Sequence, residues 1–138
     1  ATPEDIEEEF AKLFYGVGAG GELLPYASHS LTGLLYDKPL AVLRGEMSRL
    51  GLQGDPKATE PEDHIATVLE VMHTLILGHR GPEGDGCQQS FFRAHLLSWA
   101  PMFFTDLEEA ENASLYVPVG TIGTLLMEIE EQAFDMAA

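Results

Sequence analysis

Apolar side chains recur at steps of three and four residues through most of the chain, which is the spacing of one face of an α-helix. The longest segments with this pattern begin near Pro3, Pro39, Ile65, Cys87 and Val119. A further short helix is expected after Pro101, because proline interrupts the helix before it. No stretch alternates apolar and polar residues for long enough to indicate a strand. The pattern therefore predicts a single all-α domain over residues 1–138.

Polar residues before two of these segments carry helix-start signals. Thr2 stands three residues before Asp5, a spacing typical of a capped amino-terminus. Thr59 and Glu62 have the same spacing, and Pro61 between them suits a first helical turn. We interpret Thr59, Pro61 and Glu62 as the start of the helix whose first core residue is Ile65, where acidic groups also meet the positive end of the helix dipole.

Glycine-rich segments separate the predicted helices. Residues 16–21, GVGAGG, formally contain the GxGxxG pattern of dinucleotide-binding proteins. That site requires a strand before the glycines and a helix directly after them. Here a predicted helix precedes the glycines, and Leu24-Pro25 follows them. We therefore interpret 16–21 as a loop, and residues 79–86, HRGPEGDG, as another.

Composition and charge narrow the functional classes. The 138 residues are 45% hydrophobic, and 7 basic against 23 acidic side chains give a formal net charge of −16. This charge disfavours nucleic acids and anionic membrane surfaces, and it favours cationic partners. The single cysteine, Cys87, excludes an internal disulfide and suits the cytoplasm. No apolar stretch reaches the roughly 20 residues that a membrane-spanning helix needs, and the acidic start of the chain is unlike a signal peptide.

Residue patterns for catalysis or metal binding are weak. Glu70 and His73 have the ExxH spacing of di-iron bundles, but no second ExxH pair occurs. The histidines lack the spacing of zinc sites, and no nucleophile elbow surrounds Ser28. We therefore predict no catalytic residue, no metal and no cofactor.

The segment TEPEDH, residues 59–64, nevertheless concentrates acidic and imidazole groups. Capping does not account for Asp63 and His64, nor for Glu60. An acid beside an imidazole can hold a cation or accept hydrogen bonds from a peptide, and a carboxylate is the natural bidentate partner of arginine. From the residues alone, peptide recognition, an adaptor for a basic partner helix, and a metal-dependent enzyme using Glu60, Asp63 and His64 all stay open.

Three segments resemble motifs of the TorD/DmsD/NarJ family of cytoplasmic chaperones that mature redox enzymes. The first is Glu60-Pro61-Glu62-Asp63-His64, which resembles E-P-x-D-H of the family. The second resembles F-x-x-H-L-x-x-W-x-P and consists here of Phe92, His95, Leu96, Trp99 and Pro101. The third resembles LF…PYxS, with Leu13-Phe14 followed by Pro25-Tyr26-Ala27-Ser28. Because few residues precede Leu13, the chain resembles the carboxy-terminal two-thirds of the family domain.

The resemblance implies an all-α chaperone without enzymatic activity. Such proteins bind the twin-arginine signal peptide of a molybdenum-containing oxidoreductase subunit and hold that precursor in the cytoplasm until cofactor insertion. Carried over, Glu60 and Asp63 would contact the arginines, His64 would supply a hydrogen bond, and Tyr26 and Ser28 would line the groove. The second motif would serve packing, and Pro61 would be structural. The alternative is an acidic helical adaptor, and either could be a monomer or a domain-swapped dimer.

Overall fold

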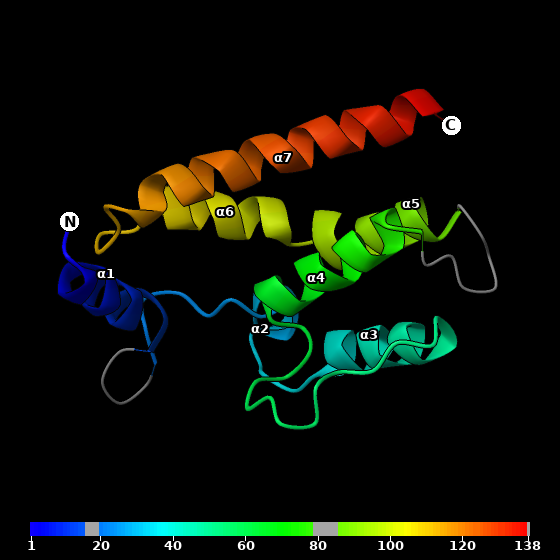
Figure 1. The fold of residues 1–138 in the computed structure, drawn as a ribbon, viewed down its shortest axis with the longest axis horizontal. Coiled ribbons are helices and arrows are strands. Elements are labelled where there is room, and N and C mark those ends of the chain that lie inside the picture. The colour runs from blue at the N-terminus through cyan, green and yellow to red at the C-terminus, as the bar shows by residue number, and fades with distance from the viewer. Residues whose placement is uncertain (16–19, 79–85, 138) are drawn as a thin grey trace. The chain divides into compact units, whose positions relative to one another are not determined.

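The computed structural model describes residues 1–15, 20–78 and 86–137, and its regular elements there are helical (Figure 1). The α-helices are α1 (Pro3–Phe10), α2 (Ala27–Thr32), α3 (Lys38–Arg49), α4 (Ile65–Ile76), α5 (Gly86–Phe92), α6 (Ala100–Glu109) and α7 (Tyr116–Ala137). Two π-helical segments, η1 (Ala11–Tyr15) and η3 (Arg93–Leu97), continue α1 and α5. The all-α prediction is confirmed. Most of the two predicted glycine loops lies outside the described residues.

The chain forms two compact units. The terminal unit consists of Ala1–Pro25 and Ala100–Ala138, and the central unit consists of Tyr26–Trp99. That residues 1–138 form one domain stays a prediction.

The terminal unit is built around the hairpin of α6 and α7, which lie side by side in Figure 1. Gly120 and Gly123 of α7 are buried against α6, where a methyl group on Gly120 would lie 2.7 Å from the Phe104 carbonyl oxygen. Only glycine permits such a close approach of two helices. Pro101 is the second residue of α6, so the predicted interruption before it is confirmed.

Acidic side chains attach the amino-terminal segment to the connection between α6 and α7. The Glu22 carboxylate accepts the backbone N–H groups of Glu111 at 2.8 Å and Asn112 at 3.0 Å. The Glu9 carboxylate accepts the N–H of Leu115 at 2.9 Å. The Glu22 bonds satisfy amide groups of the loop after α6, and the Glu9 bond satisfies one at the start of α7, where the first N–H groups lack partners within the helix.

The amino-terminus of α1 follows the sequence prediction. The Thr2 hydroxyl accepts the Asp5 N–H at 3.1 Å, and the Asp5 carboxylate accepts the Thr2 N–H at 3.0 Å. Two backbone donors that would otherwise lack partners are therefore satisfied reciprocally. The predicted capping of this helix is confirmed.

The central unit packs α2 against α3, and α4 against α5 and η3. α3 begins one residue before the predicted Pro39, and its predicted apolar face, Leu40, Leu43, Met47 and Leu50, is buried. α2 was not predicted. It follows Tyr26 and ends at Gly33, whose φ of +83° suits glycine. This short helix carries Ser28 into the interior of the unit.

The start of α4 differs from the prediction. The helix begins after His64, whose Nδ1 accepts the Ala66 N–H at 3.1 Å and so acts as the cap. The chain reaches His64 through a turn, and the β-bridge to Tyr26 holds it extended there. Thr59 and Glu62 therefore lie too far upstream to cap the helix, and their interpretation as a capping pair is wrong.

Candidate functional site

The candidate site begins where two distant motif segments meet inside the central unit. The Asp63 carbonyl accepts the Ala27 N–H at 3.1 Å, and the Asp63 carboxylate accepts the Ser28 N–H at 2.8 Å. Next to them, Tyr26 and His64 form the β-bridge, with ring centroids 5.2 Å apart in an edge-on arrangement. Four of the five predicted peptide-binding residues therefore lie together: Tyr26, Ser28, Asp63 and His64.

Asp63 and Ser28 lie in the interior. Both residues have 0% exposure, and among the described residues the second carboxylate oxygen of Asp63 and the Ser28 hydroxyl have no hydrogen-bond partner. Burying a carboxylate costs free energy unless the group accepts hydrogen bonds. The bond from the Ser28 N–H at the start of α2 offsets part of this cost for Asp63. In this conformation Asp63 positions Tyr26 and Ser28. A direct contact of Asp63 with arginine stays a prediction.

His64 is half-buried and has one ring nitrogen committed to the backbone. Burial lowers its pKa, against the opposing effect of the negative charges of Glu60 and Asp63. A lowered pKa agrees with the geometry, because Nδ1 can accept the Ala66 N–H only when it carries no proton. The neutral ring then has its proton on Nε2, which is the donor that His64 could offer to a peptide.

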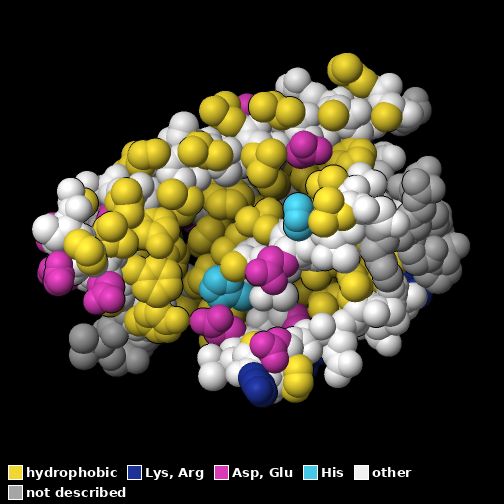
Figure 2. Space-filling model, viewed as in Figure 1, with side chains coloured by type: hydrophobic (Ala, Val, Ile, Leu, Met, Phe, Trp, Pro, Cys, Tyr) yellow, Lys and Arg dark blue, Asp and Glu magenta, His cyan; other side chains and the backbone are white. Residues whose placement is uncertain are grey.

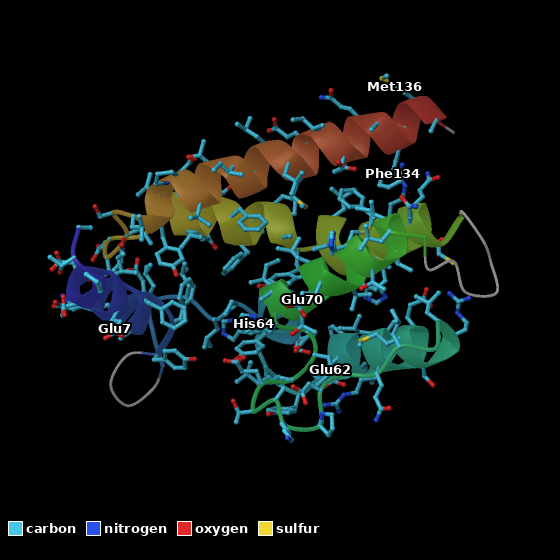
Figure 3. All side chains as sticks on the ribbon, viewed as in Figure 1. Glu7, Glu62, His64, Glu70, Phe134 and Met136 are labelled. Carbon is cyan, nitrogen blue, oxygen red and sulfur yellow. The ribbon has the colours of Figure 1, made fainter. Side chains whose placement is uncertain are left out.

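An open groove of about 680 Å³ lies beside this junction, entirely within the central unit. Its lining includes Glu60, Pro61 and Glu62 from the motif, Arg44 from α3 and Glu70 from α4. Figure 3 labels Glu62, His64 and Glu70 on these elements. Asp63 and His64 are not part of the lining. The motif therefore contributes its Glu-Pro-Glu part to the groove and its Asp-His part to the junction.

One guanidinium group is already bound on the groove wall. Arg44 donates from Nε and Nη2 to the two carboxylate oxygens of Glu62, at 2.8 and 3.0 Å. This bidentate bond raises the pKa of Arg44 and lowers the pKa of Glu62. Two parallel, charge-assisted N–H···O bonds are stronger than neutral hydrogen bonds and also fix the orientation of the guanidinium group. Sequence reasoning missed Arg44 and Glu70, because no local spacing links α3 and α4 to residues 60–62.

The second motif lies mainly in the core. Phe92, Leu96 and Trp99 are buried, and the Trp99 indole Nε1 donates to the His95 carbonyl at 2.8 Å. His95 is 9% exposed, and burial lowers its pKa. These positions are those expected for the packing role that the sequence suggested.

The described residues contain neither a cluster of metal ligands nor a membrane-spanning helix. Within 1–15, 20–78 and 86–137, no three side chains of His, Cys, Asp or Glu gather closely enough to hold a metal ion. None of the helices in the same residues has the length and apolar character required to span a membrane.

Comparisons with known proteins agree with the motifs. The family model described as nitrate reductase delta subunit matches residues 1–105. The chaperone protein TorD of Vibrio atlanticus is 28% identical over 137 residues, covering 93% of this chain and 63% of the relative. The TorD chaperone of Vibrio vulnificus is 31% identical over 121 residues, covering 81% and 56%. That of Actinobacillus succinogenes is 29% identical over 115 residues, covering 83% and 57%.

This chain thus spans about three-fifths of the length of these curated relatives. The motifs that carry the resemblance fall entirely within the residues that the family model matches. Because the model covers well over half of the chain, the chain belongs to the nitrate reductase delta subunit family, the family of the TorD and NarJ chaperones.

Proposed function

We propose that this chain is a chaperone without catalytic activity that recognises the twin-arginine signal peptide of a molybdenum-containing oxidoreductase subunit. It would hold the precursor in the cytoplasm until cofactor insertion is complete. The observation that carries the proposal is the acidic groove beside the E-P-x-D-H motif, with Glu60, Glu62 and Glu70 in its lining. The name shared by the relatives, chaperone protein TorD, supports the general function.

The Arg44–Glu62 pair supports arginine as the recognised group. It demonstrates that a guanidinium group fits this wall in bidentate geometry, with both bonds at 3.0 Å or less. A peptide arginine would use the same geometry, either on Glu60 or Glu70 or by exchange with Arg44. Lysine offers a single ammonium group and cannot form the two parallel bonds. Recognition would therefore depend on arginine itself, beyond its charge.

The net charge of −16 supports the encounter between the chain and a basic peptide. Charge complementarity raises association rates and orients the partner more than it adds to final affinity. Specificity would come from the groove, where the bidentate bonds form. A salt titration separates the two effects, because long-range steering weakens as ionic strength rises.

The proposal is tested by titrating synthetic twin-arginine signal peptides of molybdoenzyme subunits, followed by calorimetry. One peptide retains both arginines, and in a second peptide of otherwise identical sequence both arginines are replaced by lysine. We expect the lysine peptide to bind at least about tenfold more weakly. Glu60→Gln and Glu70→Gln should each weaken the arginine peptide. Glu7→Gln, an equal charge change on exposed α1 in the terminal unit, should leave it unaffected.

Equal binding of the two peptides would overturn twin-arginine recognition and support the alternative, an acidic helical adaptor for a basic partner. A separate comparison concerns Asp63. If it positions the start of α2 rather than contacting arginine, Asp63→Asn should retain the preference for arginine over lysine. Loss of the preference in Asp63→Asn, with folding unchanged, would assign Asp63 to direct contact.

A further inference from the structure

Glu62 is the least exposed of the acids that line the acidic groove. Asp55, Glu60 and Glu70 are exposed, whereas the Glu62 side chain is 24% exposed. The Glu62 side chain lies against Gly54, where an added methyl group would be 2.9 Å from Glu62 Cγ. A residue with a side chain at position 54 would therefore displace the carboxylate. Glu62 is held in place before a ligand arrives, which reduces the ordering cost of binding to it.

Arg44 already binds the carboxylate of Glu62, and it does so from a position that is open to solvent. The two bonds are those described above, at 2.8 and 3.0 Å, and the Arg44 side chain is 51% exposed. An ion pair with this exposure favours the closed arrangement by only about fivefold or less, because water screens the charges. Arg44 can therefore leave Glu62 for solvent at low cost.

The pair also borders open space on more than one side. Arg44 and Glu62 line the groove and, in addition, a neighbouring hollow of about 440 Å³ in the same unit. Departure of Arg44 therefore requires only a rotation of its side chain, without movement of α3. Figure 2 shows more acidic than basic side chains near the start of α4, an environment that attracts a second cation.

We propose that Glu62 is the arginine receptor of the groove and that Arg44 is an internal competitor, displaced by a guanidinium group of the bound peptide. The inference rests on the proposed function, because its ligand is the same arginine-containing peptide. It adds regulation to that site, since the free chain carries a substitute for its own ligand. Competition lowers the affinity for every ligand of Glu62 by one common factor, so the preference for arginine over lysine remains a property of the carboxylate.

A purely structural tie between α3 and the loop before α4 is the competing interpretation of the pair. In that case Arg44→Ala would release the loop that carries Glu62, and the affinity for the peptide would decrease or stay unchanged. If Arg44 competes with the peptide, the same substitution would make Glu62 available and increase the affinity. The direction of the change therefore separates the two interpretations.

The experiment titrates the arginine signal peptide into the wild type, Arg44→Ala and Arg49→Ala by calorimetry. Arg49 is a matched control, because it also lies on α3 and binds a carboxylate, that of Glu46, through Nε and Nη2. Its removal changes the net charge equally, but Arg49 lines neither the groove nor the neighbouring hollow. We expect Arg44→Ala to bind about two- to fivefold more tightly than Arg49→Ala. Adding Glu62→Gln to Arg44→Ala should abolish this gain.

A second measurement follows Arg44 in the wild type by NMR. Saturating peptide should move the Nε–H resonance of Arg44 to its position in Glu62→Gln, where the carboxylate is missing. An unchanged resonance, or equal affinities of Arg44→Ala and Arg49→Ala alongside a retained preference for arginine, would overturn the inference alone. Equal binding of the arginine and lysine peptides to the wild type would overturn the proposed function as well.

Discussion

The Asp63 carboxylate accepts a hydrogen bond from the Ser28 backbone N–H at 2.8 Å, across 35 positions of the sequence. The bond joins the Pro-Tyr-Ala-Ser segment to the Glu-Pro-Glu-Asp-His segment, two of the three family motifs. It sits at the start of α2, where a short helix leaves backbone donors without internal partners. This side-chain bond therefore supports the Tyr26–His64 junction together with the backbone bond from Ala27 to Asp63.

Replacement of Asp63 is expected to destabilise the central unit according to what the new side chain can accept. Asp63→Ala leaves the buried Ser28 N–H without an acceptor, at a cost of about 1–3 kcal/mol in the free energy of unfolding. Asp63→Asn retains an amide oxygen and should cost less. Urea denaturation of the three proteins measures both differences. If the urea midpoint of Asp63→Ala equals that of the wild type, the bond does not contribute to the stability of the fold.

The pH dependence of stability should reflect the half-buried His64 and the buried His95. Burial lowers the pKa values of His64 and His95 in the folded chain, so the unfolded chain binds protons more readily. Their stabilising contribution is complete above the ordinary histidine pKa of about 6.5 and is lost as the pH falls through the lowered values. Stability measured by urea denaturation should therefore decrease from about pH 7.5 to about pH 5.

His64→Asn isolates the part of this slope that belongs to the α4 cap. Asparagine is a good capping residue and does not titrate, so the variant should stay folded with a shallower pH dependence. His73→Asn, at an exposed position of the same helix, removes a histidine without touching the cap and serves as the control. A slope in His64→Asn as steep as that of the wild type would contradict the assignment.

The Arg44–Glu62 pair should couple α3 to the loop before α4. The pair is bidentate, but the Arg44 side chain is 51% exposed, so solvent screens it. A double-mutant cycle with Arg44→Ala and Glu62→Ala is expected to give a coupling of about 0.5–1 kcal/mol, decreasing with added salt. Arg44→Lys should recover less than half of it. Additive single substitutions would show that the pair contributes nothing.

Local patterns predicted the elements whose signals lie within a few residues. The Thr2–Asp5 cap, the buried face of α3 and the break before Pro101 are of this kind. The cap of α4 was missed because the β-bridge to Tyr26, distant in sequence, decides where that helix begins. A Thr-x-x-Glu spacing carries no information about such a partner.

The same limit applies to the groove and to α7. Glu70 entered the sequence argument only as half of an ExxH pair, yet it lines the groove with Glu60. The position of Glu70 in the groove lining depends on tertiary packing, which the periodicity of the sequence does not encode. On α7, periodicity identified an apolar stripe, but glycines on the neighbouring face decide which side meets α6.

Glycine-to-alanine substitutions should therefore have opposite effects on α3 and α7. In a helix interior, alanine normally stabilises relative to glycine by about 1 kcal/mol. Gly45 on α3 has no atom within 4 Å of an added methyl group, so Gly45→Ala should raise the thermal midpoint. At Gly120 the methyl group would lie 2.6 Å from the Glu108 backbone nitrogen, which cannot move without separating α6 from α7.

Gly120→Ala should lower the midpoint despite the higher helix propensity of alanine, because overpacking costs about 1–3 kcal/mol. Differential scanning calorimetry of both variants compares the two sites under identical conditions. If Gly120→Ala stabilised the chain as much as Gly45→Ala, propensity would outweigh packing at that site. The hairpin of α6 and α7 would then not depend on close approach at Gly120.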